Sequence, residues 1–373
     1  MKRLLITLAF ALALPAAAQD LLVRNATVHT AGAAGTLENH DVLVQGGVVR
    51  QVGPGLAAPA GVTVVEAKGR PLTPGLFGGL SGLGIEEVSG EAATVDTTLA
   101  MGTTVPPHED TWRPEFDVMP AFNPHSAAIG VNRVEGITFT VLSPGSVPGG
   151  SFVAGQGAAV RLDGSYEAAV AGSQSLFVNL GGGHSPLSGG SRAGQWMLLE
   201  QAVAEARTGG GDGLLTRAGR SSLAGYLAGG RVVFHVDRAA DIRQVLAFAK
   251  KHGMRPVIAG GAEAWRVAAE LKAVNAVVLV DALANLPGNF DGLGSSLETA
   301  ARLHRAGVRV GFSQRGDATH NARKQRQLAG NAVAHGLPWD AALAGLTTVP
   351  ARAFGLSNRG QIAVGQAADL VLW

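Results

Sequence analysis

The chain has 373 residues, of which 46% are hydrophobic, 16% are charged and none is cysteine. The hydrophobic share excludes intrinsic disorder, and the absence of cysteine excludes disulfides, thiolate nucleophiles and Cys-ligated metal centres. Lys and Arg number 30 against 28 Asp and Glu, and no basic stripe with interleaved aromatic residues is visible, so we expect no nucleic-acid partner.

The first eighteen residues have the pattern of a cleaved export signal. Lys2 and Arg3 precede a largely apolar run over residues 4–14, and small residues at 16–18 come directly before Gln19. The apolar run is too short to span a bilayer, and no stop-transfer pattern follows it. We therefore expect cleavage before Gln19 and a periplasmic protein without a membrane span.

Residues 20–72 predict a small β-sheet. The runs LLVRNATVHT, DVLVQGGVVRQVG and GVTVVEA are β-branched or alternating, and they are too short for helices. Gly46 and Gly47 lie between two apolar runs, which indicates a β-hairpin at that point.

From about Arg231 the pattern alternates between strands and helices. The strand candidates RVVFHV, RPVIAG, NAVVLVDA and VRVGFSQ are separated by amphipathic segments such as ADIRQVLAFAKKHG. Apolar strands in alternation with helices indicate a parallel sheet with right-handed crossovers, either closed or doubly wound. In the region 90–190, VEGITFTVLSP and SFVAGQGAAVRL predict strands among long loops, and Ser191 is the expected N-cap of the next helix.

The C-terminal stretch NAVAHGLPWDAALAGLTTVPARAFGLSNRGQIAVGQAADLVLW resembles the closing signature of the amidohydrolase superfamily. RPLTPGLFGG falls at the place of that family's first barrel strand, and NPHSAAIGVNRVEGITFTVLSPG is similar to an imidazolonepropionase-like branch. The resemblance implies an α/β fold: a (β/α)8 TIM-like barrel over residues 73–358 beside a small composite β-sandwich domain from residues 19–72 and 359–373. The family normally continues the apolar run that ends at Trp373 into further strands, and a truncated sequence would explain the difference.

The resemblance also implies positions for metal ligands, and most of them carry no ligand. In the first-strand pattern the aspartate position is Gly78 and the two histidine positions are Leu80 and Gly82. The sixth-strand histidine position is Gly260, whereas His235 stands where the family has its fifth-strand histidine. Neither an aliphatic side chain nor a glycine can bind zinc, which needs three or four ligands.

Three candidate site residues remain: Asp317, His235 and His320. The eighth-strand aspartate would fall near Ser313 or Gln314, so Asp317, a few residues later, is the candidate catalytic residue. His235 and His320 are the candidate ligand-binding residues. We expect no cofactor, and zinc only if Asp317, His320 and His235 form a rebuilt site with His235 as the metal ligand.

Several other polar residues have no assigned role. His108, His125 and His184 lie in Gly- and Pro-rich segments that predict loops. Glu86 and Glu87 follow the first strand, and adjacent side chains on an extended segment point to opposite faces. At most one of these two carboxylates therefore faces the barrel mouth.

Three functions stay open. The first is a divergent family member, descended from hydrolases of non-peptide C–N bonds, that lacks ordinary metal-dependent activity. The second is an active hydrolase of cyclic amides or related C–N bonds with a rebuilt site. The third is a protein that binds a small molecule or acts as a scaffold or oligomer partner.

Overall fold

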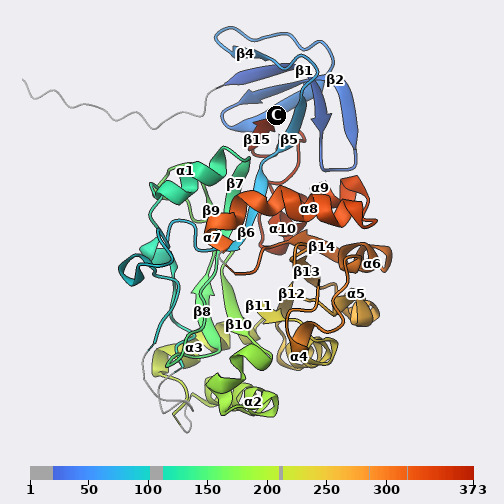
Figure 1. Ribbon diagram of the computed structural model, residues 1–373. Coiled ribbons are helices and arrows are strands. Elements are labelled where there is room, and N and C mark those ends of the chain that lie inside the picture. Colours follow the sequence, from blue (N-terminus) through green and yellow to red (C-terminus); the bar gives the residue numbers. More distant parts are fainter. Residues whose placement is uncertain (1–19, 101–111, 210–212, 285, 317) are drawn as a thin grey trace, which may run out of the picture.

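The structure is a computed structural model that describes residues 20–100, 112–209, 213–284, 286–316 and 318–373. The expected export signal, His108 and the candidate Asp317 lie outside the described residues. Figure 1 shows a small sheet that stands beyond one side of a larger body of strands and helices.

The small sheet has six strands in the order β15-β5-β1-β2-β3, with β4 also paired to β1. These strands are β1 (Leu21–His29), β2 (Thr36–Gln45), β3 (Val48–Gly53), β4 (Thr63–Glu66), β5 (Pro71–Pro74) and β15 (Leu370–Leu372). The expected hairpin joins β2 to β3, and Gly46 and Gly47 have φ values of 60° and 72°, which glycine adopts without steric cost. The C-terminal strand joins the N-terminal segment in this sheet, because β15 pairs antiparallel with β5, which pairs in turn with β1.

The larger body contains a sheet in the order β14-β13-β12-β11-β10-β8 and a second sheet in the order β6-β7-β9. Its parallel strands are β6 (Leu76–Ser81), β7 (Ile137–Leu142), β10 (Ser175–Asn179), β11 (Arg231–Val236), β12 (Arg255–Gly260), β13 (Val277–Val280) and β14 (Arg309–Phe312). Strands β10, β11 and β13 are almost wholly buried, as the apolar runs predicted, and the central residues of β12 are buried too. The result is a TIM-barrel-like fold with mixed α/β content.

One strand position departs from the expected regular repeat of eight parallel strands. Strands β8 (Val153–Gly157) and β9 (Ala159–Arg161) are consecutive; β8 pairs antiparallel with β10 and β9 pairs antiparallel with β7. Residues 153–161 therefore connect the two sheets, because β8 belongs to one sheet and β9 to the other. A parallel return needs a crossover of a dozen or more residues, usually a helix, whereas residues 143–152 contain no helix.

At the other edges of the two sheets, β14 lies next to β6, and the described residues form no strand pairing between them. The contact there runs through a side chain: the Leu80 backbone N–H donates to Ser313 Oγ at 2.9 Å. Ser313 directly follows β14, so this bond ties the last parallel strand to the first.

Helices cover the outside of this body (Figure 1). They are α1 (Ala127–Arg133), α2 (Arg192–Thr208), α3 (Arg217–Leu227), α4 (Ala239–His252), α5 (Ala268–Ala273), α6 (Thr299–Arg305), α7 (Ala318–Asn321), α8 (Gln325–Ala334), α9 (Trp339–Leu346) and α10 (Thr348–Ala353). Ser191 caps α2 as predicted, since its side chain accepts from the N–H groups of Ala193 and Gly194. Among the described residues, none of the helices combines the length and the apolar character needed to cross a bilayer.

Candidate functional site

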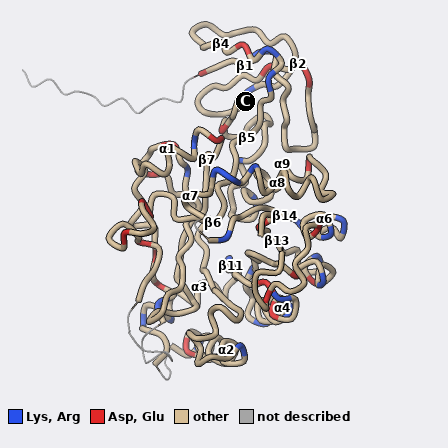
Figure 2. The backbone as a smooth tube through the Cα atoms, in the orientation of Figure 1, with Lys and Arg blue, Asp and Glu red and all other residues tan. Residues whose placement is uncertain are grey.

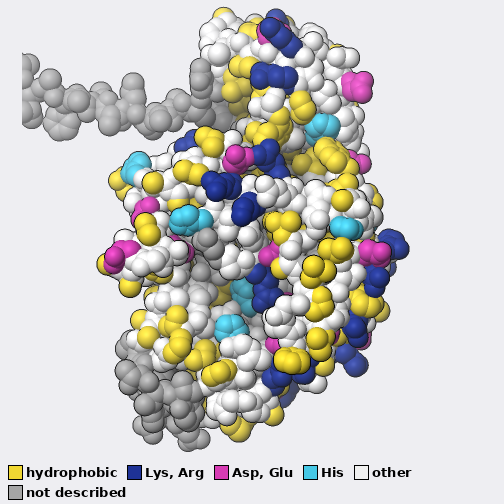
Figure 3. Space-filling model, in the orientation of Figure 1, with side chains coloured by type: hydrophobic (Ala, Val, Ile, Leu, Met, Phe, Trp, Pro, Cys, Tyr) yellow, Lys and Arg dark blue, Asp and Glu magenta, His cyan; other side chains and the backbone are white. Residues whose placement is uncertain are grey.

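A cavity of about 390 Å³ opens where the carboxyl ends of the parallel strands converge. This end of a TIM-like barrel is where ligands bind, because the loops that follow the strands meet there. In the face shown by Figure 3, histidine side chains lie beside a basic side chain near the middle of the larger body. The lining residues come from β6, β10, β11 and β12 and from the loops after β7 and β14.

This cavity contains five positions that the resemblance to the family had singled out. Leu80 and Gly82 lie at the end of β6, His235 lies in β11, Gly260 ends β12 and Ser313 follows β14, and all five line the cavity. The resemblance to the family therefore selected residues that are neighbours in space. The only polar side-chain groups among these five residues are one imidazole and one hydroxyl.

His235 is held in a desolvated environment. Burial lowers the pKa of its imidazole to about 3, and the positive charge of Arg315 and the neighbouring His184 act in the same direction. The ring lies near Phe177, with 6.4 Å between the ring centroids. The imidazole is therefore neutral at pH 7 and is a weak base.

Arg315 supplies a positive charge at the mouth. Its guanidinium forms an ion pair with Asp237, a carboxylate that is 7% exposed at the end of β11. Its backbone N–H donates to Asp281 Oδ2 at 2.8 Å, and Asp281 in turn accepts from the Leu283 N–H at 3.0 Å. Two acidic residues, Asp237 after β11 and Asp281 after β13, thus fix Arg315 at the cavity.

The space around Gly82 is filled by a second polar pair. Thr319 Oγ1 accepts from the Gly82 N–H at 3.0 Å and donates to Glu86 Oε2 at 2.8 Å. Glu86 lines the cavity, whereas Glu87 accepts a hydrogen bond from Ser126 at 2.9 Å. The expectation that at most one of the two adjacent carboxylates faces the mouth is confirmed, and that residue is Glu86.

Other polar groups are available to a ligand. Asn179 lines the cavity and donates from Nδ2 to Ser146 Oγ at 2.8 Å. Gln314 also lines it, and its Oε1 atom is buried with no hydrogen-bond partner in the described part of the chain. A buried acceptor without a partner is costly, so a donor group on a ligand would stabilise this side chain.

The remaining candidate histidines do not join His235. His320 is exposed on α7 and is not among the described residues that line the cavity, although its neighbour Thr319 is. His125 is exposed and packs edge-on against Tyr166, with ring centroids 5.3 Å apart. His184 lies near Arg315 and Asp291, and burial is the main cause that lowers its pKa. Sequence reasoning missed Arg315, because no pattern pairs it with Asp237.

The donor set does not fit the metal that the resemblance implies. Within residues 20–100, 112–209, 213–284, 286–316 and 318–373, no group of three or more His, Asp or Glu side chains is placed to hold a metal ion. Catalytic zinc needs three protein ligands and a second shell that orients them. At the mouth, His235 has a guanidinium nearby in place of partner ligands.

The fold and part of the sequence match known proteins. Residues 220–373 match the amidohydrolase family model. An amidohydrolase structure from Thermotoga maritima MSB8 is similar, with a TM-score of 0.80, 24% identity and coverage of 95% of this chain and 94% of that chain. A zinc-bound adenosine deaminase from Xanthomonas campestris matches with a TM-score of 0.52, 18% identity and coverage of 95% and 84%.

A molinate hydrolase structure is also similar, with a TM-score of 0.53, 12% identity and coverage of 95% and 89%. No curated protein sequence matches the chain. The structural likenesses concern the fold, and the family match covers the segment from α3 to β15. Together with the fold, that match supports a relationship of this chain to the amidohydrolase superfamily.

Proposed function

We propose that this protein binds a small molecule with a carboxylate or a similar oxyanion at the barrel mouth and does not carry out ordinary metal-dependent hydrolysis. The relationship to the superfamily supports descent from hydrolases of C–N bonds. The observation that carries the proposal is the position of Arg315, which lines the cavity beside Gly260, the residue at the family's sixth-strand histidine position.

The chemistry of the cavity fits an anionic ligand. A guanidinium binds a carboxylate through parallel N–H donors, and such charge-assisted hydrogen bonds are about twice as strong as neutral ones. The cavity volume of about 390 Å³ is within the range of small-molecule sites. Asn179, Gln314 and the hydroxyl groups at the mouth provide neutral donors and acceptors for the rest of the ligand.

The hydrolase alternative needs a group that activates water, and the described residues give it little support. Neutral His235, with a pKa of about 3, is a poor general base at pH 7. Glu86 already accepts a hydrogen bond from Thr319. A rebuilt site with His320 would need that exposed side chain to move into the cavity.

A matched pair of probes tests the proposal. Hydantoin is a neutral cyclic amide, and its ring-opened product N-carbamoylglycine carries a carboxylate. We expect N-carbamoylglycine to raise the melting temperature and hydantoin to have no effect, because only the carboxylate pairs with Arg315. Arg315→Gln should abolish the shift, and Arg315→Lys should retain part of it since the positive charge remains.

A variant outside the cavity serves as the control for this experiment. Arg323→Gln removes an exposed arginine outside the cavity and should respond like the wild type. The same samples are analysed for zinc and assayed for hydantoin hydrolysis. Stoichiometric zinc together with hydrolysis that His235→Ala abolishes would overturn the proposal in favour of an active hydrolase. A lack of response to any small carboxylate would favour a scaffold.

A further inference from the structure

A second cavity, of about 430 Å³, lies at the opposite end of the parallel strands. Arg231, Arg255 and Arg309 are the first residues of β11, β12 and β14, so their side chains converge at the amino end of the sheet. Lys250 adds a cation from the end of α4, and Arg352 adds one from α10. None of the described lining residues is an Asp or a Glu.

The five cations have no carboxylate partner. In the part of the chain that the structure describes, no Asp or Glu oxygen lies within 4.0 Å of Arg231, Lys250, Arg255, Arg309 or Arg352. Elsewhere, segments with acidic and with basic residues are scattered over the molecule, as Figure 2 shows, and several arginines are paired with carboxylates. The cavity is therefore a local excess of positive charge in a protein whose net charge is only +2.

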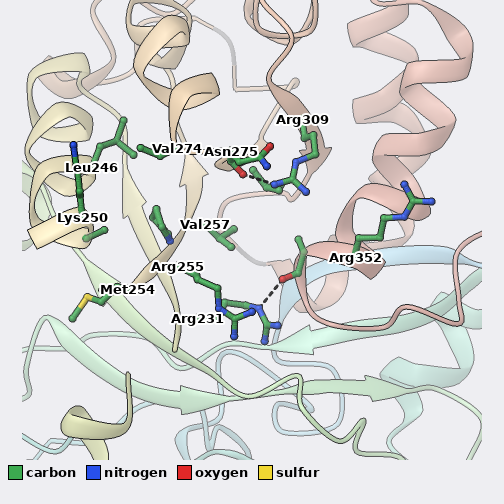
Figure 4. A pocket seen from close by; sticks show the side chains of 14 residues that line it. Arg231, Leu246, Lys250, Met254, Arg255, Val257, Val274, Asn275, Arg309 and Arg352 are labelled. Carbon is green, nitrogen blue, oxygen red and sulfur yellow. Dashed lines mark hydrogen bonds between the residues drawn. The ribbon is translucent and has the colours of Figure 1, made fainter. Parts of the chain in front are cut away.

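The arginines are fixed in place by backbone groups. Arg231 is 5% exposed, and its Nε donates to Ala353 O at 2.6 Å. Arg255 Nε donates to Gly229 O at 2.6 Å, and Arg309 donates to Asn275 O. Figure 4 shows the guanidinium groups of Arg231 and Arg255 side by side, with that of Arg309 on the other side of Val257. A carbonyl oxygen orients a guanidinium but does not neutralise its charge.

The positive charges in this cavity lower one another's pKa values. Burial and the charge of Arg255 lower the pKa of Arg231 to about 10, and burial and the charge of Arg352 lower the pKa of Arg309. Each cation thus makes its neighbours harder to keep protonated, so the folded state carries an unfavourable electrostatic energy at this end of the barrel. An anion bound in the cavity would remove that cost.

One wall of the cavity is apolar. Leu246, Met254, Val257 and Val274 line it beside the cations, and the cavity volume is within the range of about 300–1,000 Å³ typical of small-molecule sites. A concave site that combines several guanidinium groups with an apolar wall suits a ligand with several oxyanion charges and an apolar part. An acidic protein surface would instead contact the exposed rim and leave the depth of the cavity unfilled.

We propose that this cavity is a binding site for a polyanionic small molecule, of phosphate or carboxylate type with an apolar portion, separate from the barrel mouth. The site lies at the amino ends of the strands, so it is distinct from the residues around His235 and Arg315. Its occupation neutralises the charge at the arginines and stabilises the folded state.

Calorimetry with sodium pyrophosphate and with citrate tests the proposal, at ionic strength matched with sodium chloride. The side chains of Lys250 and Arg352 form no hydrogen bond or ion pair with other described residues, so Arg352→Gln and Lys250→Gln remove charge without removing a side-chain contact of that kind. We expect each variant to weaken binding about tenfold, which is the effect of one lost charge-assisted hydrogen bond. Without ligand, both variants should melt no lower than the wild type.

Arg243→Gln is the matched control, because Arg243 lies on the same helix as Lys250 but faces Glu270 at 3.4 Å. It should bind both probes like the wild type. Saturable binding of either probe with the expected losses supports the proposal, and the stronger probe identifies phosphate or carboxylate as the preferred group. The proposal is overturned if neither probe binds, if Arg352→Gln binds as tightly as Arg243→Gln, or if only poly-glutamate binds, which would indicate a protein partner.

Discussion

Arg315 and Asp237 form an ion pair directly beside Gly260 at the mouth of the barrel. A Cβ atom on residue 260 would lie 2.7 Å from Asp237 Oδ1 and 3.4 Å from Arg315 Nη1. The ion pair therefore occupies the space that a larger side chain at this position would need. The family resemblance places a metal-binding histidine at this position, whereas here the space beside Gly260 holds an ion pair whose Asp237 carboxylate is already bound to Arg315.

Gly260→Ala should destabilise the folded protein. The backbone at Gly260 has a φ of 92°, which an L side chain rarely adopts, and the new Cβ would contact Asp237 Oδ1. We expect the free energy of unfolding to fall by about 1–3 kcal/mol in urea denaturation. Gly330→Ala on α8 has no atom within 4 Å of its new Cβ and should instead stabilise slightly. Equal stability of the two variants would show that the space around Gly260 is open.

Restoring the two first-strand histidines should not restore a metal site. A Cβ on residue 82 would lie 2.8 Å from Thr319 Oγ1 and 2.9 Å from Glu86 Oε2, so a histidine there displaces the Thr319–Glu86 pair. We expect Leu80→His with Gly82→His to lose about 1–3 kcal/mol of stability through overpacking and to bind less than one equivalent of zinc by elemental analysis. Leu80→Met, which conserves volume, is the control and should retain wild-type stability. A stable double variant with stoichiometric zinc would contradict this account.

His235 should contribute to the pH dependence of stability. Its folded-state pKa of about 3 is below the ordinary value of 6.5, so between these values the unfolded state binds more protons than the folded state. The free energy of unfolding therefore falls as pH drops through this window. His235→Gln removes the group, and urea denaturation at pH 7, 5 and 4 should show a shallower fall. Thr97→Ala, which changes the cavity lining without removing an imidazole, should keep the wild-type slope; an unchanged slope in His235→Gln would count against a buried neutral imidazole.

The sequence pattern of the first eighteen residues predicts a processed N-terminus. When the full chain is expressed in a Gram-negative host, mass spectrometry of the periplasmic fraction should show a protein that begins at Gln19, because the small residues 16–18 suit signal peptidase. A charge-neutralised leader, with Lys2→Gln and Arg3→Gln, should reduce the exported amount. A cytoplasmic product that keeps Met1 in the wild-type chain would refute the prediction.

Local sequence patterns were sufficient to predict much of the secondary structure. The apolar runs from Arg231 onward became β11 to β14, and the amphipathic segment between the first two became α4. The sequence was also sufficient to show that the side chains at 80, 82 and 260 supply no metal ligand, because they are leucine and glycine. These conclusions depend only on the identity of single residues or of their near neighbours.

The tertiary structure decided what lies around those residues. The antiparallel direction of residues 153–161 followed from a short connection and from pairing with strands on both sides. Arg315 and Asp237 are 78 residues apart in the sequence, so no local sequence pattern predicts their ion pair. The basic cavity was invisible to composition because its five cations are scattered from Arg231 to Arg352 in a chain of nearly balanced charge. They come together because parallel strands start at one end of the sheet, so residues far apart in sequence share one surface.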